Sequence, residues 1–133
     1  VKERVDASGL KNIRVLPFIS RMDLAYEVAD LIVSRAGANT ISELGVVGKP
    51  VILVPSPNVS EDHQTHNAES LVSKGAALLV RDAEAEELLV ERMLGLMEDQ
   101  AEKEKLSQNI KQLGIFDASQ RIAAEVQNLL IKQ

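Results

Sequence analysis

Residues 30–43 read Asp-Leu-Ile-Val-Ser-Arg-Ala-Gly-Ala-Asn-Thr-Ile-Ser-Glu, an apolar run followed by small residues and a helix-opening signal. The run at 31–34 is rich in β-branched residues, which is typical of a strand buried in a sheet. Thr40 and Glu43 have the spacing of a capping box, in which both side chains bond free N–H groups of a helix start. The helix should end near Gly48, ahead of Pro50. We therefore expect a strand–turn–helix unit here.

The turn of this unit is a candidate phosphate site. In a parallel sheet it lies at the carboxyl edge of the strands, where ligands bind. The first amides of a helix lack internal partners, and the small residues at 36–38 allow a phosphate to approach them. The chain has no dinucleotide-binding or P-loop sequence pattern, however. The spacing alone favours a purely structural turn, with Glu43 serving only to cap Thr40, because an isolated glycine turn is a weak motif.

Apolar runs bounded by Gly and Pro continue along the chain and mark further strands and helices. This pattern predicts a helix that ends at Gly9 and a final helix opened by Asp117. The expected strands are residues 13–19, 31–34, 51–54 and 76–80, and the expected helices are 22–29, 40–47, 62–74, 84–98, 101–113 and 118–131. Strands alternating with helices across short turns indicate an α/β fold with a parallel sheet covered by helices.

Composition narrows the class of protein. The 133 residues are enough for one domain with a core, and 45% of them are apolar. The net charge is −5, there is no Trp and only one Tyr, so a nucleic-acid surface with a basic face and stacking aromatics is not expected. Without Cys there are no disulfides or thiolate metal sites. No apolar run is long enough to span a bilayer.

A second polar cluster occupies residues 62–67, Asp-His-Gln-Thr-His-Asn. His63 and His66 are three apart on one helical face, but the zinc-protease pattern and a third ligand are missing, so we assign no metal. Two interpretations stay open. The Gln, His and Asn side chains can hydrogen-bond a neutral polar ligand, or the cluster is a solvated first turn in which Asp62 complements the helix dipole.

The motifs taken together are similar to those of the MurG family, the UDP-N-acetylglucosamine–N-acetylmuramyl-(pentapeptide) pyrophosphoryl-undecaprenol N-acetylglucosamine transferases. The resemblance rests on the order and spacing of F-I-x-x-M (18–22), A-D-L-I-V-S-R-A-G-A-x-T-I-S-E-L (29–44), G-K-P (48–50), V-P-S-P (54–57), D-H-Q-x-x-N-A (62–68) and F-D-A (116–118). It implies a Rossmann-like sheet that forms part of the C-terminal, donor-binding domain of a GT-B glycosyltransferase. It implies no cofactor.

The resemblance also implies roles for individual residues. The backbone at Ile19 is expected to meet the uracil of UDP-N-acetylglucosamine, and Glu43 its two ribose hydroxyls. Ala38, Asn39 and Thr40 are expected at the diphosphate and sugar. Gln64, with His63 beside it, is expected at the N-acetylglucosamine. A carboxylate suits a diol, and helix-start amides suit a phosphate.

We expect residues 1–133 to be a partial donor domain, without its first strands and without the N-terminal domain that binds the lipid-linked acceptor. No catalytic residue is assigned, and the chain alone is expected to be inactive. The parent enzyme is expected in the cytoplasm, peripheral on the inner face of the bacterial membrane. Alternatives are another GT-B transferase that uses a UDP- or dTDP-sugar, and a non-catalytic subunit of a membrane partner. Unpaired strand 13–19 and the apolar face with Ile122, Val126 and Leu130 predict self-association.

Overall fold

The computed structural model describes residues 2–58 and 63–131, without the side chains of residues 116–118 and 131. Its sheet has three parallel strands in the order β1 (Ile32–Ser34), β2 (Val51–Leu53) and β3 (Leu78–Leu79). Ile52, in the middle strand, lies between Val33 of β1 and Leu78 of β3. The predicted α/β class, with a parallel sheet and flanking helices, is confirmed.

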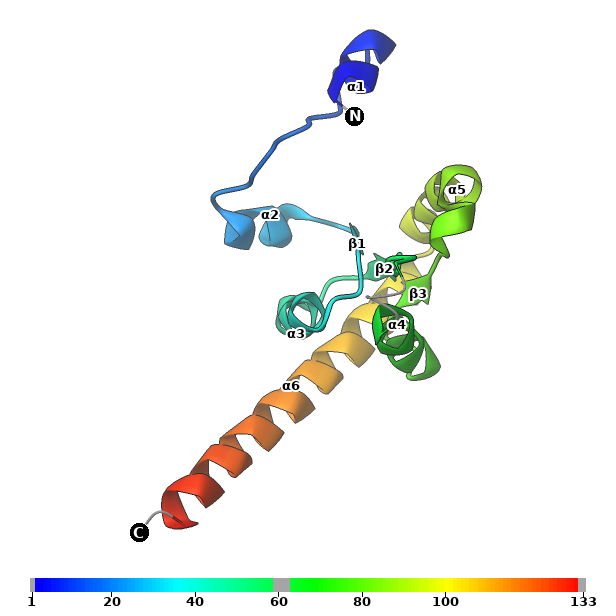
Figure 1. Ribbon diagram of the computed structural model, residues 1–133. Coiled ribbons are helices and arrows are strands. Elements are labelled where there is room, and N and C mark those ends of the chain that lie inside the picture. Colours follow the sequence, from blue (N-terminus) through cyan, green and yellow to red (C-terminus); the bar gives the residue numbers. More distant parts are fainter. Residues whose placement is uncertain (1, 59–62, 132–133) are drawn as a thin grey trace.

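Helices connect and cover these strands (Figure 1). The connections are α3 (Ala38–Val47) between β1 and β2, and α4 (His63–Ser73) between β2 and β3. After β3 come the short 3-10 helix η2 (Asp82–Glu84), α5 (Ala85–Glu98) and α6 (Gln100–Ile131). The predicted helices 40–47, 62–74 and 84–98 are confirmed within two residues at each end, although Asp62 lies outside the described residues.

The predicted strand at 13–19 is wrong. Between α1 (Lys2–Ser8) and α2 (Met22–Val28) the chain is irregular and largely exposed, and it leads to α1 away from the sheet (Figure 1). A strand is stable when its N–H and C=O groups pair with a neighbour, and the described sheet contains only β1, β2 and β3. Pro17 also lacks the N–H that a ladder requires. The apolar residues of segment 13–19 therefore add no strand to the described sheet.

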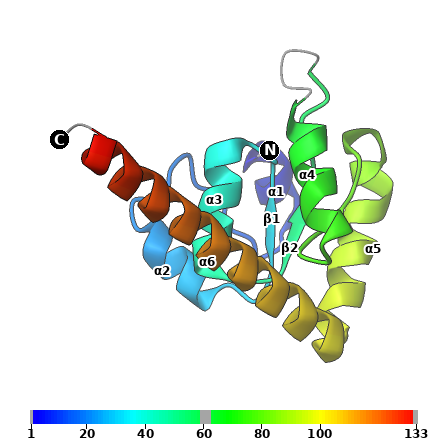
Figure 2. The same ribbon diagram turned by 90° about the horizontal axis from the view of Figure 1, so that it is seen from below.

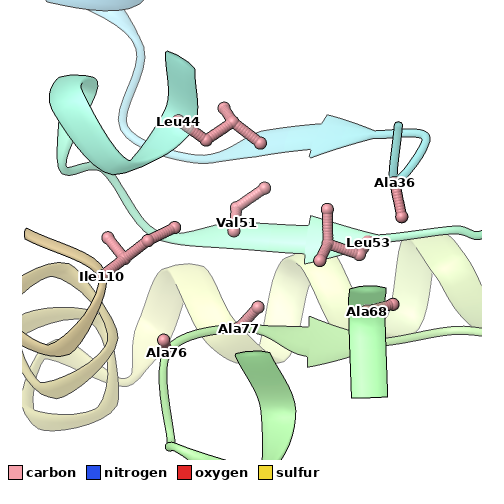
Figure 3. Packing of buried hydrophobic residues seen from close by; sticks show 8 residues of the cluster. All are labelled: Ala36, Leu44, Val51, Leu53, Ala68, Ala76, Ala77 and Ile110. Carbon is pink, nitrogen blue, oxygen red and sulfur yellow. The ribbon is translucent and has the colours of Figure 1, made fainter. Parts of the chain in front are cut away.

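The side chains of β2 alternate between the two faces of the sheet, and both faces are covered. Val51 and Leu53 are fully buried among Leu44, Ala68 and other residues of α3, α4 and α6 (Figure 3). Ile52, also fully buried, joins a second cluster with residues of α5 and α6. Continuous apolar strands buried on both sides are typical of parallel sheets.

Helix α6 is one continuous helix, so the predicted separation into 101–113 and 118–131 is wrong, and Asp117 does not open a helix. Helix α6 crosses α3 (Figure 2). Gly114 lies within the continuous helix and against Gly45 of α3. A Cβ atom on Gly114 would lie 2.6 Å from the carbonyl oxygen of Gly45 in α3. The absence of a side chain at both glycines lets the two backbones approach closely.

Glycines in the left-handed conformation end α3 and α4. Gly48 has φ +69° and Gly75 has φ +68°. At Gly75 the amides of Gly75 and Ala76 bond the carbonyls of Val72 and Leu71, a Schellman end that keeps residue 76 out of the predicted strand 76–80. Helix α6 holds both ends, because Ser107 Oγ donates to Gly48 O and Asn109 Nδ2 to Gly75 O (2.9 Å).

The second half of α6 extends beyond the sheet (Figure 1). It carries exposed apolar side chains. Ile122, Val126 and Leu130 are 50–65% exposed. Self-association through this face stays a prediction, and the unpaired strand 13–19 no longer supports it.

Replacing Gly114 by Ala is expected to lower the free energy of unfolding by about 1–3 kcal/mol, because an added methyl overpacks the crossing by more than alanine's helix preference offsets. Gly95→Ala in α5 is the matched control. Its Cβ would meet nothing within 4 Å, so it should raise stability by about 0.5–1 kcal/mol. Urea denaturation measures both. A Gly114→Ala chain as stable as the unmodified one would contradict a close crossing.

Candidate functional site

The turn between β1 and α3 lies at the carboxyl edge of the sheet, where the sequence predicts a site. The structure starts α3 earlier than expected: Gly37 is the N-cap, with no side-chain cap, and Ile41 N–H makes the first helical bond, 3.0 Å to Gly37 O. The predicted capping box of Thr40 and Glu43 is therefore wrong, because Thr40 already lies in the first helical turn, past the position from which its hydroxyl could cap.

This earlier start changes which groups are available at the turn. Helix geometry leaves the amides of Ala38, Asn39 and Thr40 without an intrahelical partner. They lie at the positive end of the helix dipole, where an anion is favoured. Among the residues that the structure describes, no side-chain oxygen caps the helix at Gly37. Three residues predicted for the site thus lie together at one helix end.

Gln64, in the first turn of α4, is the buried polar side chain of this site, 9% exposed. Its Oε1 accepts hydrogen bonds from Ala36 N–H (3.3 Å) and Ser56 N–H (2.9 Å), which join the turns after β1 and β2. The other end of the amide lies near the N-cap. A Cβ built on Gly37 would lie 4.0 Å from Gln64 Nε2 and 3.9 Å from Thr40 Oγ1. Two hydrogen-bonding side chains therefore flank the open side of Gly37.

Glu43 lies on the exposed side of α3 and faces α2. Its Oε2 accepts a hydrogen bond of 3.3 Å from the hydroxyl of Tyr26. The pKa of the Tyr26 hydroxyl is raised, first by burial and then by the charge and hydrogen bond of Glu43. A cavity of about 560 Å³ opens here between the two helices; Met22, Asp23, Tyr26, Glu27, Glu43, Val46, Val47 and Lys49 line it. It combines apolar side chains with three carboxylates, those of Asp23, Glu27 and Glu43.

Sequence reasoning gave no separate role to Arg35, which connects all three strand ends. From the turn after β1, its Nη1 lies 2.6 Å from Asp82 Oδ1, beyond β3. The same nitrogen donates to the carbonyls of Val54 (3.3 Å) and Pro55 (3.4 Å), beyond β2. A charged residue directly after a buried strand is the signal that could have identified it. Arg35 thereby fixes the shape of the edge beside the N-terminus of α3.

The other residues predicted for the site, His63 and Ile19, are more exposed than Gln64. His63 is the exposed first residue of α4, next to Gln64, and His66 is also exposed. Ile19 lies in the irregular segment before α2 and is 39% exposed, so its contact with a base stays a prediction. Within residues 2–58 and 63–131, no three His, Cys, Asp or Glu side chains gather as a metal site would require.

Residues 1–122 match the family model of the glycosyltransferase family 28 C-terminal domain. The chain belongs to this family. The resemblance to MurG is confirmed by relatives named UDP-N-acetylglucosamine--N-acetylmuramyl-(pentapeptide) pyrophosphoryl-undecaprenol N-acetylglucosamine transferase. The Flavobacterium psychrophilum protein is 46% identical over 126 residues, which are 95% of this chain and 34% of that protein. The Porphyromonas gingivalis protein is 54% identical over 113 residues, 85% of this chain and 30% of that protein.

A solved structure agrees with this membership in family 28. The crystal structure of Acinetobacter baumannii MurG superposes with a TM-score of 0.71 at 31% identity, covering 83% of this chain and 33% of that one. The chain thus spans about a third of the length of the relatives it matches. None of its described helices is both long and apolar enough to cross a membrane.

Tyr26 is the one tyrosine of this family 28 chain, so tyrosinate absorbance in an alkaline titration reports its pKa directly. Glu43→Gln should lower that pKa, because a negative charge beside the phenol is removed, yet leave it above its ordinary value, because burial is the larger cause. Since the pKa is raised in the folded state, the stability that Tyr26 contributes is present below about pH 10 and lost as the pH rises through the raised value.

The control for this titration is Glu27→Gln, which removes another carboxylate from the same cavity and should leave the pKa of Tyr26 in place. A Glu43→Gln chain whose Tyr26 titrates as in the unmodified chain would contradict the Tyr26–Glu43 contact.

Proposed function

We propose that this chain is the donor-binding part of a glycosyltransferase of peptidoglycan synthesis. The donor is UDP-N-acetylglucosamine, and the complete enzyme transfers N-acetylglucosamine to the lipid-linked muramyl-pentapeptide. This enzyme acts in the cytoplasm at the inner face of the bacterial membrane. Membership of the family, the names of the relatives and the chemistry of the carboxyl edge support the proposal.

The observation that carries the proposal is the uncapped N-terminus of α3 beside Gly37. The amides of Ala38, Asn39 and Thr40 suit the diphosphate, because backbone N–H groups at a helix start combine hydrogen bonds with the favourable end of the dipole. With no side chain on Gly37, a phosphate oxygen can approach the backbone closely. Thr40 Oγ1 and Gln64 Nε2, on either side of that space, donate to the phosphate or the adjoining sugar.

The cavity beside Glu43 suits the nucleoside. A carboxylate accepts hydrogen bonds from both hydroxyls of a ribose, and the Tyr26 hydroxyl on Oε2 orients it for that contact. The apolar side chains of Met22 and Val46 give the cavity a wall for the flat base or sugar. His63 is exposed and lies in the same turn of α4 as Gln64, which is the residue proposed to contact the N-acetylglucosamine.

In the proposed reaction the 4-hydroxyl of the acceptor sugar attacks C1 of N-acetylglucosamine and gives up its proton to a general base, a role assigned to no residue of this chain. The bond from C1 to the diphosphate breaks with inversion. Negative charge grows on the departing UDP. Fixed amides at the start of α3 stabilise that charge without having to reorient, which is how preorganised donors lower a barrier. The role of this chain is therefore to hold the donor and its leaving group.

Gly37→Ala tests the diphosphate contact. Its φ of −65° suits Ala, and the new methyl would make ordinary contacts of 3.9–4.0 Å with Thr40 and Gln64. Stability should change by less than about 1 kcal/mol. Binding of UDP, expected near millimolar for the chain alone, should fall about tenfold or more because the methyl fills the space for a phosphate. Amide shifts in an NMR titration with UDP measure it. An unchanged affinity for UDP would show that the diphosphate does not bind at Gly37.

Glu43→Gln tests the ribose contact. The amide retains one acceptor but loses the second and the charge that strengthens both bonds, so UDP binding should weaken about ten- to hundredfold. The melting temperature should stay nearly unchanged, because Glu43 is exposed and does not cap α3. Glu27→Gln, a carboxylate of the same cavity, is the control and should leave binding intact. Equal UDP affinity in the Glu43→Gln and unmodified chains would exclude Glu43 from the ribose.

A further inference from the structure

Both backbone groups of Ala36, the residue before the N-cap of α3, are held by one turn of α4. The N–H of Ala36 donates to Gln64 Oε1 at 3.3 Å, and its carbonyl accepts from Asn67 Nδ2 at 3.1 Å. Residues three apart share a helix face, so the two amide side chains reach the same point of the turn. The Ala36 side chain is fully buried in the core cluster, which blocks movement from the other side.

The hydrogen bond from Asn67 orients the whole peptide group between Ala36 and Gly37, as well as the carbonyl that accepts it. The C=O of Ala36 and the N–H of Gly37 belong to the same peptide group, which is planar and trans. In such a group the C=O and N–H point in opposite directions. By holding the carbonyl toward α4, Asn67 therefore fixes the direction of the Gly37 N–H and the plane from which α3 begins. The amides of the next residues follow from that plane.

We propose that Asn67 is a positioning residue for the donor. It orients the Ala36–Gly37 peptide so that the amides at the start of α3 face the diphosphate, without itself needing to touch it. This inference rests on the donor-binding function proposed above. Gln64 cannot replace Asn67 in this role, because its Oε1 holds the N–H of Ala36, which belongs to the preceding peptide group.

A matched asparagine elsewhere separates positioning from ordinary stabilisation. Asn109 Nδ2 donates to the carbonyl of Gly75 at 2.9 Å, and both asparagines are half-buried. Gly75 ends α4 and precedes β3, so this contact lies at the amino edge of the sheet, opposite the candidate site. Asn→Asp at either position keeps the shape but replaces the donor by an oxygen, which faces a carbonyl and cannot bond it.

The experiment measures UDP-N-acetylglucosamine affinity, melting temperature and backbone amide shifts in the unmodified, Asn67→Asp and Asn109→Asp chains. Both variants should lose similar stability. Asn67→Asp should weaken donor binding about three- to tenfold, and Asn109→Asp should leave it unchanged. In the absence of ligand, the amide signals of residues 37–40 should shift in Asn67→Asp and stay in place in Asn109→Asp. Asn67→Ala repeats the test without the repulsion of a carboxylate if Asn67→Asp does not fold.

The outcomes distinguish this inference from the proposed function. If the unmodified chain binds the donor and Asn67→Asp or Asn67→Ala binds equally well, Asn67 does not position the site, while the donor-binding function stands. If the two Asp variants weaken binding alike, the effect is one of stability alone and the inference fails. If the unmodified chain does not bind UDP-N-acetylglucosamine, both the function and the inference are overturned.

Discussion

A parallel strand in the middle of a sheet must be covered on both faces, and the packing of this chain follows from meeting that requirement for β2. Its three residues are fully buried, with Val51 and Leu53 on one side and Ile52 on the other. Two clusters result, one against α3, α4 and α6 and the other against α5 and α6. Helix α6 contributes to both, with Ile110 in the first and Leu106 in the second. It is the element that closes the core.

The close approach of α6 then fixes the helices that carry the site. Gly45 and Gly114 bring α3 and α6 into backbone contact, and Ser107 and Asn109 bind the carbonyls at the ends of α3 and α4. Both helices are thus anchored at their C-terminal ends, at the amino edge of the sheet. Their N-terminal ends lie at the opposite edge, where the amides of Ala38, Asn39 and Thr40 at the start of α3 have no intrahelical partner. The core therefore positions the site from the side where no ligand is expected.

At that edge the polar groups divide between structure and ligand. The oxygen of Gln64 holds two backbone amides, and its nitrogen lies on the open side of Gly37. Glu43, likewise, receives the Tyr26 hydroxyl on one oxygen. Arg35 is hydrogen-bonded to the carbonyls that follow β2 and paired with Asp82. Because these internal bonds fix the side chains in advance, a donor molecule would meet groups that need little reordering, which lowers the entropic cost of binding.

The sequence by itself determined the α/β class, the positions of β1, β2 and most helices, the family resemblance and the residues around the turn. These follow from local signals: β-branched runs, helical periodicity, glycine stops and motifs at fixed spacing. Only the tertiary structure decided that residues 13–19 form no strand, since a strand depends on a neighbour, and that α6 continues through Gly114, since Gly45 packs against it. It also moved the start of α3 from Thr40 to Ala38, with Gly37 as the N-cap, and paired Glu43 with Tyr26 instead of Thr40. The contacts of Arg35, Gln64 and Asn67 join segments 19 to 47 positions apart in the sequence, except for the bond from Ser56 to Gln64. Local patterns carry no information on such pairs, because chain folding alone brings them together.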